Sequence, residues 1–291
     1  MSAVRIGAAA AHFGRDIRRS IAKVESIIAD ARRQGLALLV LPDGTLGGYL
    51  GDLKHPDPGS LPPSVRLDGA ELQRLRAAAR DMVVCLGLTE ENDAGGRHNT
   101  AVCFQGDGIL GVHRKVHQPL GESEVYVAGR TFEAFDTPIG RMGLLIDYDK
   151  TFPEAARSLA LDGAVVLACL SAWPASTTDR ASRLPKDRQS RLFDIYDAAR
   201  AAENQVVLVS SNQTGITGGL RFLGQAKVIS PGGEALARTD SKGGLAIAEL
   251  DIAAEIGRSR RVLRHLEERV VESYRSTASA RFSDTSEEPL R

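Results

Sequence analysis

The sequence is poor in features that mark a specialised environment. Its 291 residues include three cysteines and one tryptophan, and 37 Lys and Arg residues balance 37 Asp and Glu residues. Zero net charge removes the basic electrostatic footprint of a general nucleic-acid-binding protein and argues against a polybasic membrane anchor. No apolar run approaches the roughly 18–20 residues that a membrane span needs. We therefore expect neither a nucleic-acid partner nor a membrane partner.

The cysteines and the first residues bear on the compartment. Cys85, Cys103 and Cys169 lie far apart and form no Cys-x-x-Cys pair, which fits a reducing cytosol better than a disulfide framework. Residues 1–11 contain one basic residue, Arg5, and no cleavage-site pattern, so we expect no signal peptide and a cytoplasmic location. The sequence has no Gly-x-Gly-x-x-Gly and no Walker loop, so we expect no nucleotide cofactor.

What the sequence does contain is a regular alternation of helical and strand patterns. Ile17, Ile21, Val24 and Ile28 recur at helical spacing, and the continuous apolar run Leu36–Leu41 is typical of a strand buried on both faces. Such alternation predicts a layered α/β domain. We predict helices over 15–34, 72–82, 153–161 and 192–204, and strands over 4–11, 36–41, 83–89, 99–105, 109–115, 142–146, 164–170, 206–211, 226–230 and 245–250.

The last part of the chain carries three further expectations. The segments 226–230 and 245–250 are predicted to bracket a turn at 231–233. Residues 253–274 form a charged segment with a helical pattern, either a solvated surface helix or a subunit-contact arm. The stretch 276–291 is polar and is expected to be a loose tail, which gives one domain over 1–275.

Charged residues follow several predicted buried strands. Asp43 follows one strand, Lys115 ends another, and Asp147 follows a third. That edge of an α/β sheet is where sites usually lie. Burying a charge there is unfavourable unless the charge is paired or capped. Each of these residues is therefore either a structural cap or a functional group.

Several motifs occur together in a fixed order, and no one of them is decisive alone. They are Pro42-Asp43 with Gly48-Tyr49; His98-Asn99-Thr100-Ala101; Arg114-Lys115-Val116-His117; Glu122 with Tyr126 and Gly129; Tyr148-Asp149 with Phe152-Pro153-Glu154; Ala172-Trp173-Pro174; Arg200-Ala201 with Glu203-Asn204; Ser211-Asn212-Gln213 with Gly215; and Gly224 with Pro231 and Gly233. In this order the chain resembles the nitrilase (carbon–nitrogen hydrolase) superfamily along nearly its whole length.

The resemblance implies a fold, an assembly and a chemistry. The fold is an α-β-β-α sandwich, usually paired into an αββααββα dimer or a higher homo-oligomer. The substrate is a small molecule, attacked by a Cys nucleophile with the help of a Glu base, a Lys that stabilises the oxyanion, and a second Glu. Lys115 stands at the Lys position and Glu122 at the second Glu. Tyr49, Tyr148 and Trp173 are candidates for substrate binding.

Two positions depart from the family pattern. Asp43 stands where the family has the Glu base, which withdraws the carboxylate by roughly one C–C bond, about 1.5 Å. Asp147 stands where the family has the Cys nucleophile. Without a thiol at this position, the covalent thioester that a Cys nucleophile would form cannot arise there. A carboxylate is a weaker nucleophile toward an amide than a thiolate. The candidate catalytic set is then Asp43, Lys115, Glu122 and Asp147, in which three carboxylates around one lysine should raise at least one pKa.

Several interpretations stay open at this point. In the first, Asp147 acts as acid/base and Lys115 as electrophilic stabiliser, in hydrolysis through water or in a dehydration, isomerisation or cyclisation. In the second, the chain is an inactive binding or regulatory protein. A magnesium or manganese site built from the carboxylates is a third, but Lys115 in their midst would repel the ion, so we expect no metal. A fourth is an engineered variant of a Cys enzyme, but a simple knockout of the nucleophile does not explain the second change, at Asp43. A relocated thiol at Cys169 is a separate alternative, although a buried strand cysteine is more often an inert small apolar residue.

Overall fold

The computed structural model describes residues 3–92 and 95–274. The predicted tail over 276–291 lies outside the described residues. The α-helices are α1 (Ile17–Arg33), α2 (Ala70–Ala79), α3 (Pro153–Leu161), α4 (Arg188–Asn204) and α5 (Ile252–Ser259). The strands are β1 (Val4–Ala11), β2 (Leu36–Val40), β3 (Val83–Glu91), β4 (Arg97–Gln105), β5 (Gly108–Arg114), β6 (Met142–Ile146), β7 (Val166–Ser171), β8 (Val207–Gln213), β9 (Ile216–Thr217), β10 (Leu220–Arg221), β11 (Lys227–Ile229), β12 (Ala235–Arg238) and β13 (Gly244–Leu250).

The strands form two packed halves joined at one short pairing. One half runs β13-β1-β2-β3-β4-β5 and the other β6-β7-β8-β11-β12. The halves meet where β1 pairs with β8 through Ala10↔Asn212 and Ala11↔Gln213. Strands β1, β2 and β3 are parallel to one another, as are β6, β7 and β8, so their carboxyl ends lie at common edges.

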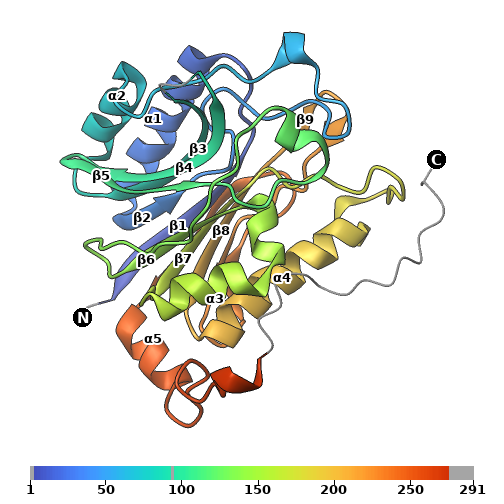
Figure 1. Cartoon of the computed structure of the whole chain (residues 1–291). Helices are drawn as coiled ribbons and strands as arrows, with labels where there is room; N and C mark the ends of the chain where they lie inside the picture. The colour runs from blue at the N-terminus through green and yellow to red at the C-terminus, as the bar shows by residue number, and fades with distance from the viewer. Residues whose placement is uncertain (1–2, 93–94, 275–291) are drawn as a thin grey trace, which may run out of the picture.

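Three apolar cores separate four layers. The central core joins residues of both sheet halves, among them Ile6, Val40, Leu144 and Val209. A second core packs α1 and α2 against the first half, and a third packs α3 and α4 against the other. Figure 1 shows α1 and α2 on one side of the strands and α3 and α4 on the other. The α-β-β-α sandwich predicted from the sequence is therefore confirmed.

Local sequence explains most of these elements. Helix α1 begins where the Asp16 carboxylate accepts a hydrogen bond from the Arg19 backbone N–H at 3.0 Å, an N-cap. Its predicted apolar face is buried through Ile21, Val24 and Ile28. The strand predicted over 142–146 and the helix predicted over 153–161 have the bounds of β6 and α3. The hairpin predicted around 106–108 is the antiparallel pair β4–β5.

Two predictions near the carboxyl end were wrong. Across the turn at 231–233, β11 pairs with β12, whereas the predicted strand 245–250 belongs to β13 and pairs with β1. Strand β12 is mostly exposed and lacks the apolar run that marks a buried strand.

The helix predicted over 253–274 ends at Ser259. Arginines at 258, 261 and 264 would stand three residues apart in a longer helix, and this like-charge spacing is unfavourable.

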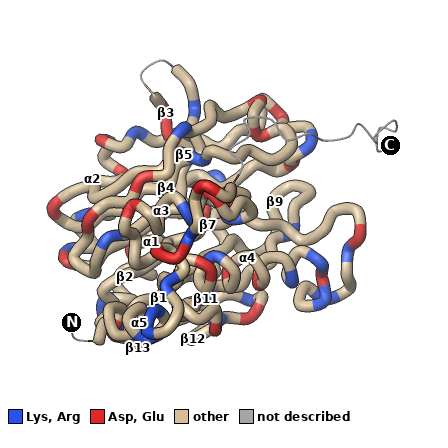
Figure 2. Tube along the Cα trace, turned by 60° about the horizontal axis from the view of Figure 1, so that its bottom comes forward, with Lys and Arg blue, Asp and Glu red and all other residues tan. Residues whose placement is uncertain are grey.

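The charges are distributed without a dominant sign. Figure 2 shows acidic and basic residues interspersed along the trace, in keeping with the equal totals of the sequence. Among the described residues, no helix combines the length and the apolar character needed to cross a membrane.

Candidate active site

The predicted catalytic residues converge on one lysine. Lys115 follows β5, and its side chain is fully buried. Its Nζ lies 2.9 Å from Glu122 Oε1 and 2.8 Å from Oε2, and 3.4 Å from Asp147 Oδ2. Glu122 comes from the short 3₁₀ helix 120–124, and Asp147 is the first residue of another, 147–151, directly after β6. Two carboxylates from different segments therefore share one ammonium group, and Asp147 is 32 residues from the lysine in the sequence.

Asp43 interacts electrostatically with Lys115, Asp147 and Glu122, and it has hydrogen-bond partners of its own. Asn99 Nδ2 donates to Asp43 Oδ2 at 3.0 Å, and Gln213 Nε2 donates to the Asp43 backbone carbonyl at 2.8 Å. A Cβ at Gly87 would stand 2.6 Å from Asp43 Cα, so the bare glycine lets the loop after β2 lie against β3. Asn99 belongs to the predicted motif around His98, but the sequence alone did not give it a role toward Asp43.

Burial controls the electrostatics of this cluster. Desolvation raises the pKa of Asp43 to about 7, although the Lys115 charge opposes the shift. Burial also raises the pKa of Glu122, again against Lys115. For Lys115, burial alone would lower the pKa, but the negative charges of Glu122 and Asp147 outweigh it and raise the pKa. The lysine is therefore held as an ammonium, while Asp43 titrates near neutral pH.

Asp147 occupies a strained turn at one side of a pocket. Its φ is +48°, in the left-handed region that few non-glycine residues adopt. Its Oδ2 faces Lys115, while Oδ1 is buried and accepts no hydrogen bond from any described residue. Such an orphaned acceptor is unfavourable unless a bound molecule supplies a donor.

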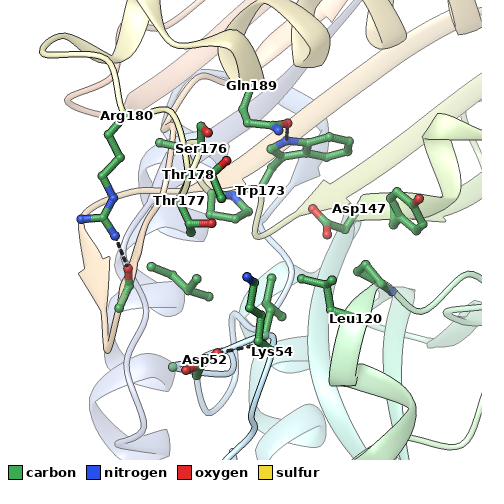
Figure 3. Close-up of a pocket in the computed structure, with 18 residues that line it drawn as sticks. Asp52, Lys54, Leu120, Asp147, Trp173, Ser176, Thr177, Thr178, Arg180 and Gln189 are labelled. Carbon is green, nitrogen blue, oxygen red and sulfur yellow. Dashed lines mark hydrogen bonds between the residues drawn. The ribbon is translucent and has the colours of Figure 1, made fainter. Parts of the chain in front are cut away.

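A cavity of about 480 Å³ opens in front of Asp147. Figure 3 shows Asp147 at one side of it, with Trp173 and Leu120 nearby. Among the four predicted catalytic residues, only Asp147 lines this cavity; Asp43, Lys115 and Glu122 lie behind it. Most of the remaining wall comes from loop residues that the sequence analysis did not single out, in the ranges 51–54, 119–120, 174–178 and 219–220.

The three predicted binding residues have different positions. Trp173 and Tyr148 line the cavity. The Trp173 indole donates to Gln189 Oε1 at 3.0 Å, and its backbone N–H donates to Asn212 Oδ1 at 2.8 Å. Tyr49 is buried away from the cavity, and its hydroxyl donates to Glu122 Oε1. The structure thus places Tyr49 behind the catalytic cluster, where it positions Glu122.

The turn that carries Asp147 is anchored by its neighbour Asp149. His113 Nε2 and His117 Nδ1 each lie 2.9 Å from an Asp149 oxygen, and the His117 and Ile146 backbone N–H groups donate to it. Burial alone would raise the pKa of Asp149, but these hydrogen bonds hold that pKa well below its usual range. Asp149 therefore ties the segment after Lys115 to the turn after β6.

No cysteine reaches the cavity. Cys85, Cys103 and Cys169 are all free and buried, and none lines the pocket. Cys169, in β7, lies 3.7 Å from Ser171 Oγ, and burial raises the pKa of its thiol to about 12. A neutral thiol inside the sheet is a poor nucleophile. The described part of the chain also holds no group of three or more His, Cys, Asp or Glu side chains placed to bind a metal ion.

Comparison with known proteins identifies the family. A carbon–nitrogen hydrolase family model matches residues 6–258, so the chain belongs to the carbon–nitrogen hydrolase family, also called the nitrilase superfamily. It is 30% identical over 237 residues to a nitrilase of Pyrococcus abyssi, across 80% of this chain and 84% of that protein.

Solved structures support the same placement. The carbon–nitrogen hydrolase of Helicobacter pylori G27 has a TM-score of 0.81 and 26% identity, covering 94% of this chain and 97% of that chain. A mutant amidase of Nesterenkonia sp. AN1 has a TM-score of 0.72 and 25% identity over 92% of this chain and 97% of that chain. That structure shows the Michael addition of acrylamide at the amidase's active-site cysteine. In the present chain the pocket holds Asp147 and no cysteine.

Proposed function

We propose that this chain is a nitrilase-superfamily enzyme that acts on a carbon–nitrogen bond of a small amide- or nitrile-like substrate without a cysteine nucleophile. The observation that carries the proposal is the placement of Asp147. It alone among the four catalytic candidates lines the cavity, with one oxygen on Lys115 and the other unpartnered. A carboxylate in this position can accept a proton from a bound water or donate one to a leaving group.

For hydrolysis of an amide, the proposed steps balance as follows. Asp147 takes a proton from water, and the oxygen of that water bonds to the amide carbon. The carboxyl group then gives the proton to the leaving nitrogen, the C–N bond breaks, and ammonia and a carboxylic acid result. Lys115 lies behind Asp147 and does not line the cavity, so its proposed role as electrophilic stabiliser requires a substrate oxygen to pass beside Asp147 Oδ2 and reach the ammonium. The same proton transfers would serve a dehydration, isomerisation or cyclisation.

Asp43 and Glu122 have supporting roles in this proposal. Glu122 holds the Lys115 ammonium through both carboxylate oxygens. Asp43, whose pKa burial raises to about 7, is a reservoir for one proton near neutral pH. Because neither lines the cavity, their proposed action passes through Lys115 and Asp147.

An inactive binding or regulatory protein is the second candidate. The same placement of Asp147 favours it, because this side chain separates the three deeper residues from the cavity. In this alternative the pocket binds a small molecule, and binding survives Asp147→Asn.

We also propose the domain bounds, the cellular location and the oligomeric state of the chain. The carbon–nitrogen hydrolase-like domain spans 1–275 and 276–291 is a polar tail, as the sequence predicts. The chain acts in the cytoplasm as a homodimer or higher homo-oligomer, as the family resemblance implies.

The test compares wild type, Asp147→Asn and Lys115→Ala on a panel of small amides, nitriles and carbamoyl compounds. Ammonia release and mass spectrometry of products would detect hydrolytic and other outcomes. We expect turnover by wild type and a loss of about 100-fold or more in Asp147→Asn, the usual range for general acid–base catalysis. Asp136→Asn, an exposed carboxylate on the surface, is the matched control. Turnover that neither Asp147→Asn nor Lys115→Ala reduces would refute the proposal.

A further inference from the structure

Gln189 lines the cavity near the start of helix α4, and both its backbone and its side chain are anchored. Its backbone N–H donates to the carboxylate of Asp187, the N-cap of the helix, at 2.9 Å. Its side-chain Oε1 accepts the indole N–H of Trp173 at 3.0 Å. Both Gln189 and Trp173 line the cavity, and Figure 3 shows them joined by this hydrogen bond. The side chain is therefore held on the cavity wall.

The hydrogen bond from Trp173 fixes the orientation of the Gln189 amide. A glutamine amide accepts hydrogen bonds at its oxygen and donates them at its NH2 group, and a half-turn exchanges the two ends. An indole N–H can only donate, so the oxygen must face it. The NH2 group is then the end left over, and among residues 3–92 and 95–274 no atom accepts a hydrogen bond from it. Its N–H donors remain for a molecule in the cavity.

The indole that orients this amide is itself immobilised. The Trp173 backbone N–H donates to Asn212 Oδ1 at 2.8 Å. Its ring packs against Phe193 and Tyr196, with centroids 5.8 Å away in both pairs. The Lys150 ammonium lies 5.2 Å from the ring centroid, a cation–π contact. A ring packed in this way cannot turn its N–H away from Gln189 unless its neighbours repack.

We propose that Gln189 is a specificity-determining residue, whose NH2 group donates to an acceptor oxygen in the part of the substrate that lies along Trp173. Trp173 is its positioning residue. The inference rests on the proposed function only in assigning the cavity to the substrate. It adds a substrate class, a small carbon–nitrogen compound that carries an ether or hydroxyl oxygen besides its reacting group. Gln189 is uncharged, so this oxygen need not be ionised. A wholly aliphatic chain would cover the donors and leave them unpaired, which is unfavourable.

The test compares small amides that differ in a single chain atom. The probes are the terminal methoxy derivatives of acetamide, propanamide and butanamide, each paired with the straight-chain amide in which CH2 replaces the ether oxygen. Ligand-observed NMR titration gives the dissociation constants, and the readout is their ratio within a pair. Paired probes have nearly the same size, so a change in packing alone leaves this ratio unchanged. Asp147→Asn, measured beside wild type, removes interference from turnover.

We expect Gln189→Met, which removes the donor, to weaken binding of the best ether amide by about threefold to tenfold relative to its straight-chain partner. This is the range for one uncharged hydrogen bond. Gln189→Glu keeps an acceptor for the indole and loses the N–H donors, so it should shift the ratio in the same direction. Gln73→Met changes an exposed glutamine of helix α2, outside the cavity, and should keep the wild-type ratio. A thermal melt of each variant confirms that it is folded.

Trp173→Phe tests the positioning role. Phenylalanine keeps an aromatic ring but has no N–H, so the Gln189 amide can turn and present its oxygen to the cavity. We expect the ratio to move toward that of Gln189→Met. The double variant Trp173→Phe/Gln189→Met should show no further change, because the amide that Trp173 orients is gone. A ratio that Trp173→Phe leaves unchanged, or changes equally in both backgrounds, would overturn the role of Trp173.

Two results would overturn the role of Gln189. They are no binding of any ether amide by wild type, and a ratio that Gln189→Met leaves unchanged in every pair. Neither touches the proposed catalysis, since Asp147-dependent turnover of a straight-chain amide would still support it. Conversely, a ratio that depends on Gln189, combined with turnover that does not depend on Asp147, would refute the catalysis and leave this inference standing.

Discussion

Asp147 Oδ2 lies 3.4 Å from Lys115 Nζ, whereas both oxygens of Glu122 lie within 2.9 Å of the same nitrogen. The lysine is therefore bound mainly by Glu122, from the side away from the cavity. Asp147 is the looser partner and the one that faces the cavity. This inequality lets Asp147 exchange protons with a ligand while Glu122 keeps the lysine in place.

The buried ammonium should be essential for stability as well as for function. In Lys115→Met, Glu122 and Asp147 lose their cation inside the protein. Removing one partner of a buried ion pair typically costs about 3–5 kcal/mol, so we expect a loss of that order in unfolding free energy at pH 7. Urea denaturation followed by circular dichroism would measure it. Lys186→Met, at an exposed lysine, is the control and should change stability little; a similar loss in both variants would contradict the argument.

Asp43 should make the protein less stable as the pH rises. Burial raises its pKa to about 7 in the folded state, above its ordinary value near 4. The folded protein then binds more protons than the unfolded chain between these values, so the free energy of unfolding falls with rising pH. The variant Asp43→Asn has no titrating carboxyl group at this position, so its stability lacks this pH dependence. Wild type should lose at most about 4 kcal/mol relative to this variant between pH 4 and pH 7. Parallel denaturation curves at several pH values would measure the difference, and a constant gap would argue against it.

Asp149 should have the opposite pH dependence. The hydrogen bonds from His113 and His117 outweigh burial and hold its pKa below the ordinary value. Its contribution to stability is therefore present above the unfolded pKa near 4 and is lost as the pH falls. Asp149→Asn should be less stable than wild type by about 3 kcal/mol at pH 7. The gap should narrow between pH 5 and pH 3. A gap that widens on acidification would show that Asp149 is not ionised in the folded protein.

Gly129 should tolerate no side chain. A Cβ there would stand 2.0 Å from the Arg114 carbonyl oxygen, next to Lys115. We expect Gly129→Ala to lower stability by about 2 kcal/mol or more, because backbone must move to make room. Gly257→Ala is a matched control: a Cβ at Gly257 in helix α5 meets nothing within 4 Å. That change should be neutral or slightly stabilising. Equal thermal midpoints for both variants would count against the close approach at Gly129.

The buried helices and strands of this fold could be predicted because the spacing of apolar residues along the sequence indicates which faces are buried. Strand β6 and helix α3 carry continuous or regularly spaced apolar residues, and both were predicted at their observed bounds. Strand β12 and the end of helix α5 were missed, since exposed residues leave no such pattern. The expectation that Lys115, Glu122 and Asp147 lie in one site came from the family resemblance, which the order of the motifs carries.

The pocket itself could not be read from the sequence. Lys54 and Arg180 lie in irregular loops far apart in the chain, and only the fold brings them to one cavity. The position of Tyr49 behind Glu122, rather than in the cavity, likewise depends on how its loop packs. Asp149 shows the same limit: its two histidine partners are more than 30 residues away.

The central claim is that chemistry in this pocket depends on a carboxylate and on no thiol. The most direct measurement is kcat for Asp147→Asn and Cys169→Ala beside wild type, on a substrate found with the amide and nitrile panel. Cys169 is buried and outside the cavity. We predict that Cys169→Ala keeps the wild-type kcat, while Asp147→Asn loses about 100-fold or more. Loss of turnover in Cys169→Ala, with Asp147→Asn still active, would contradict the account.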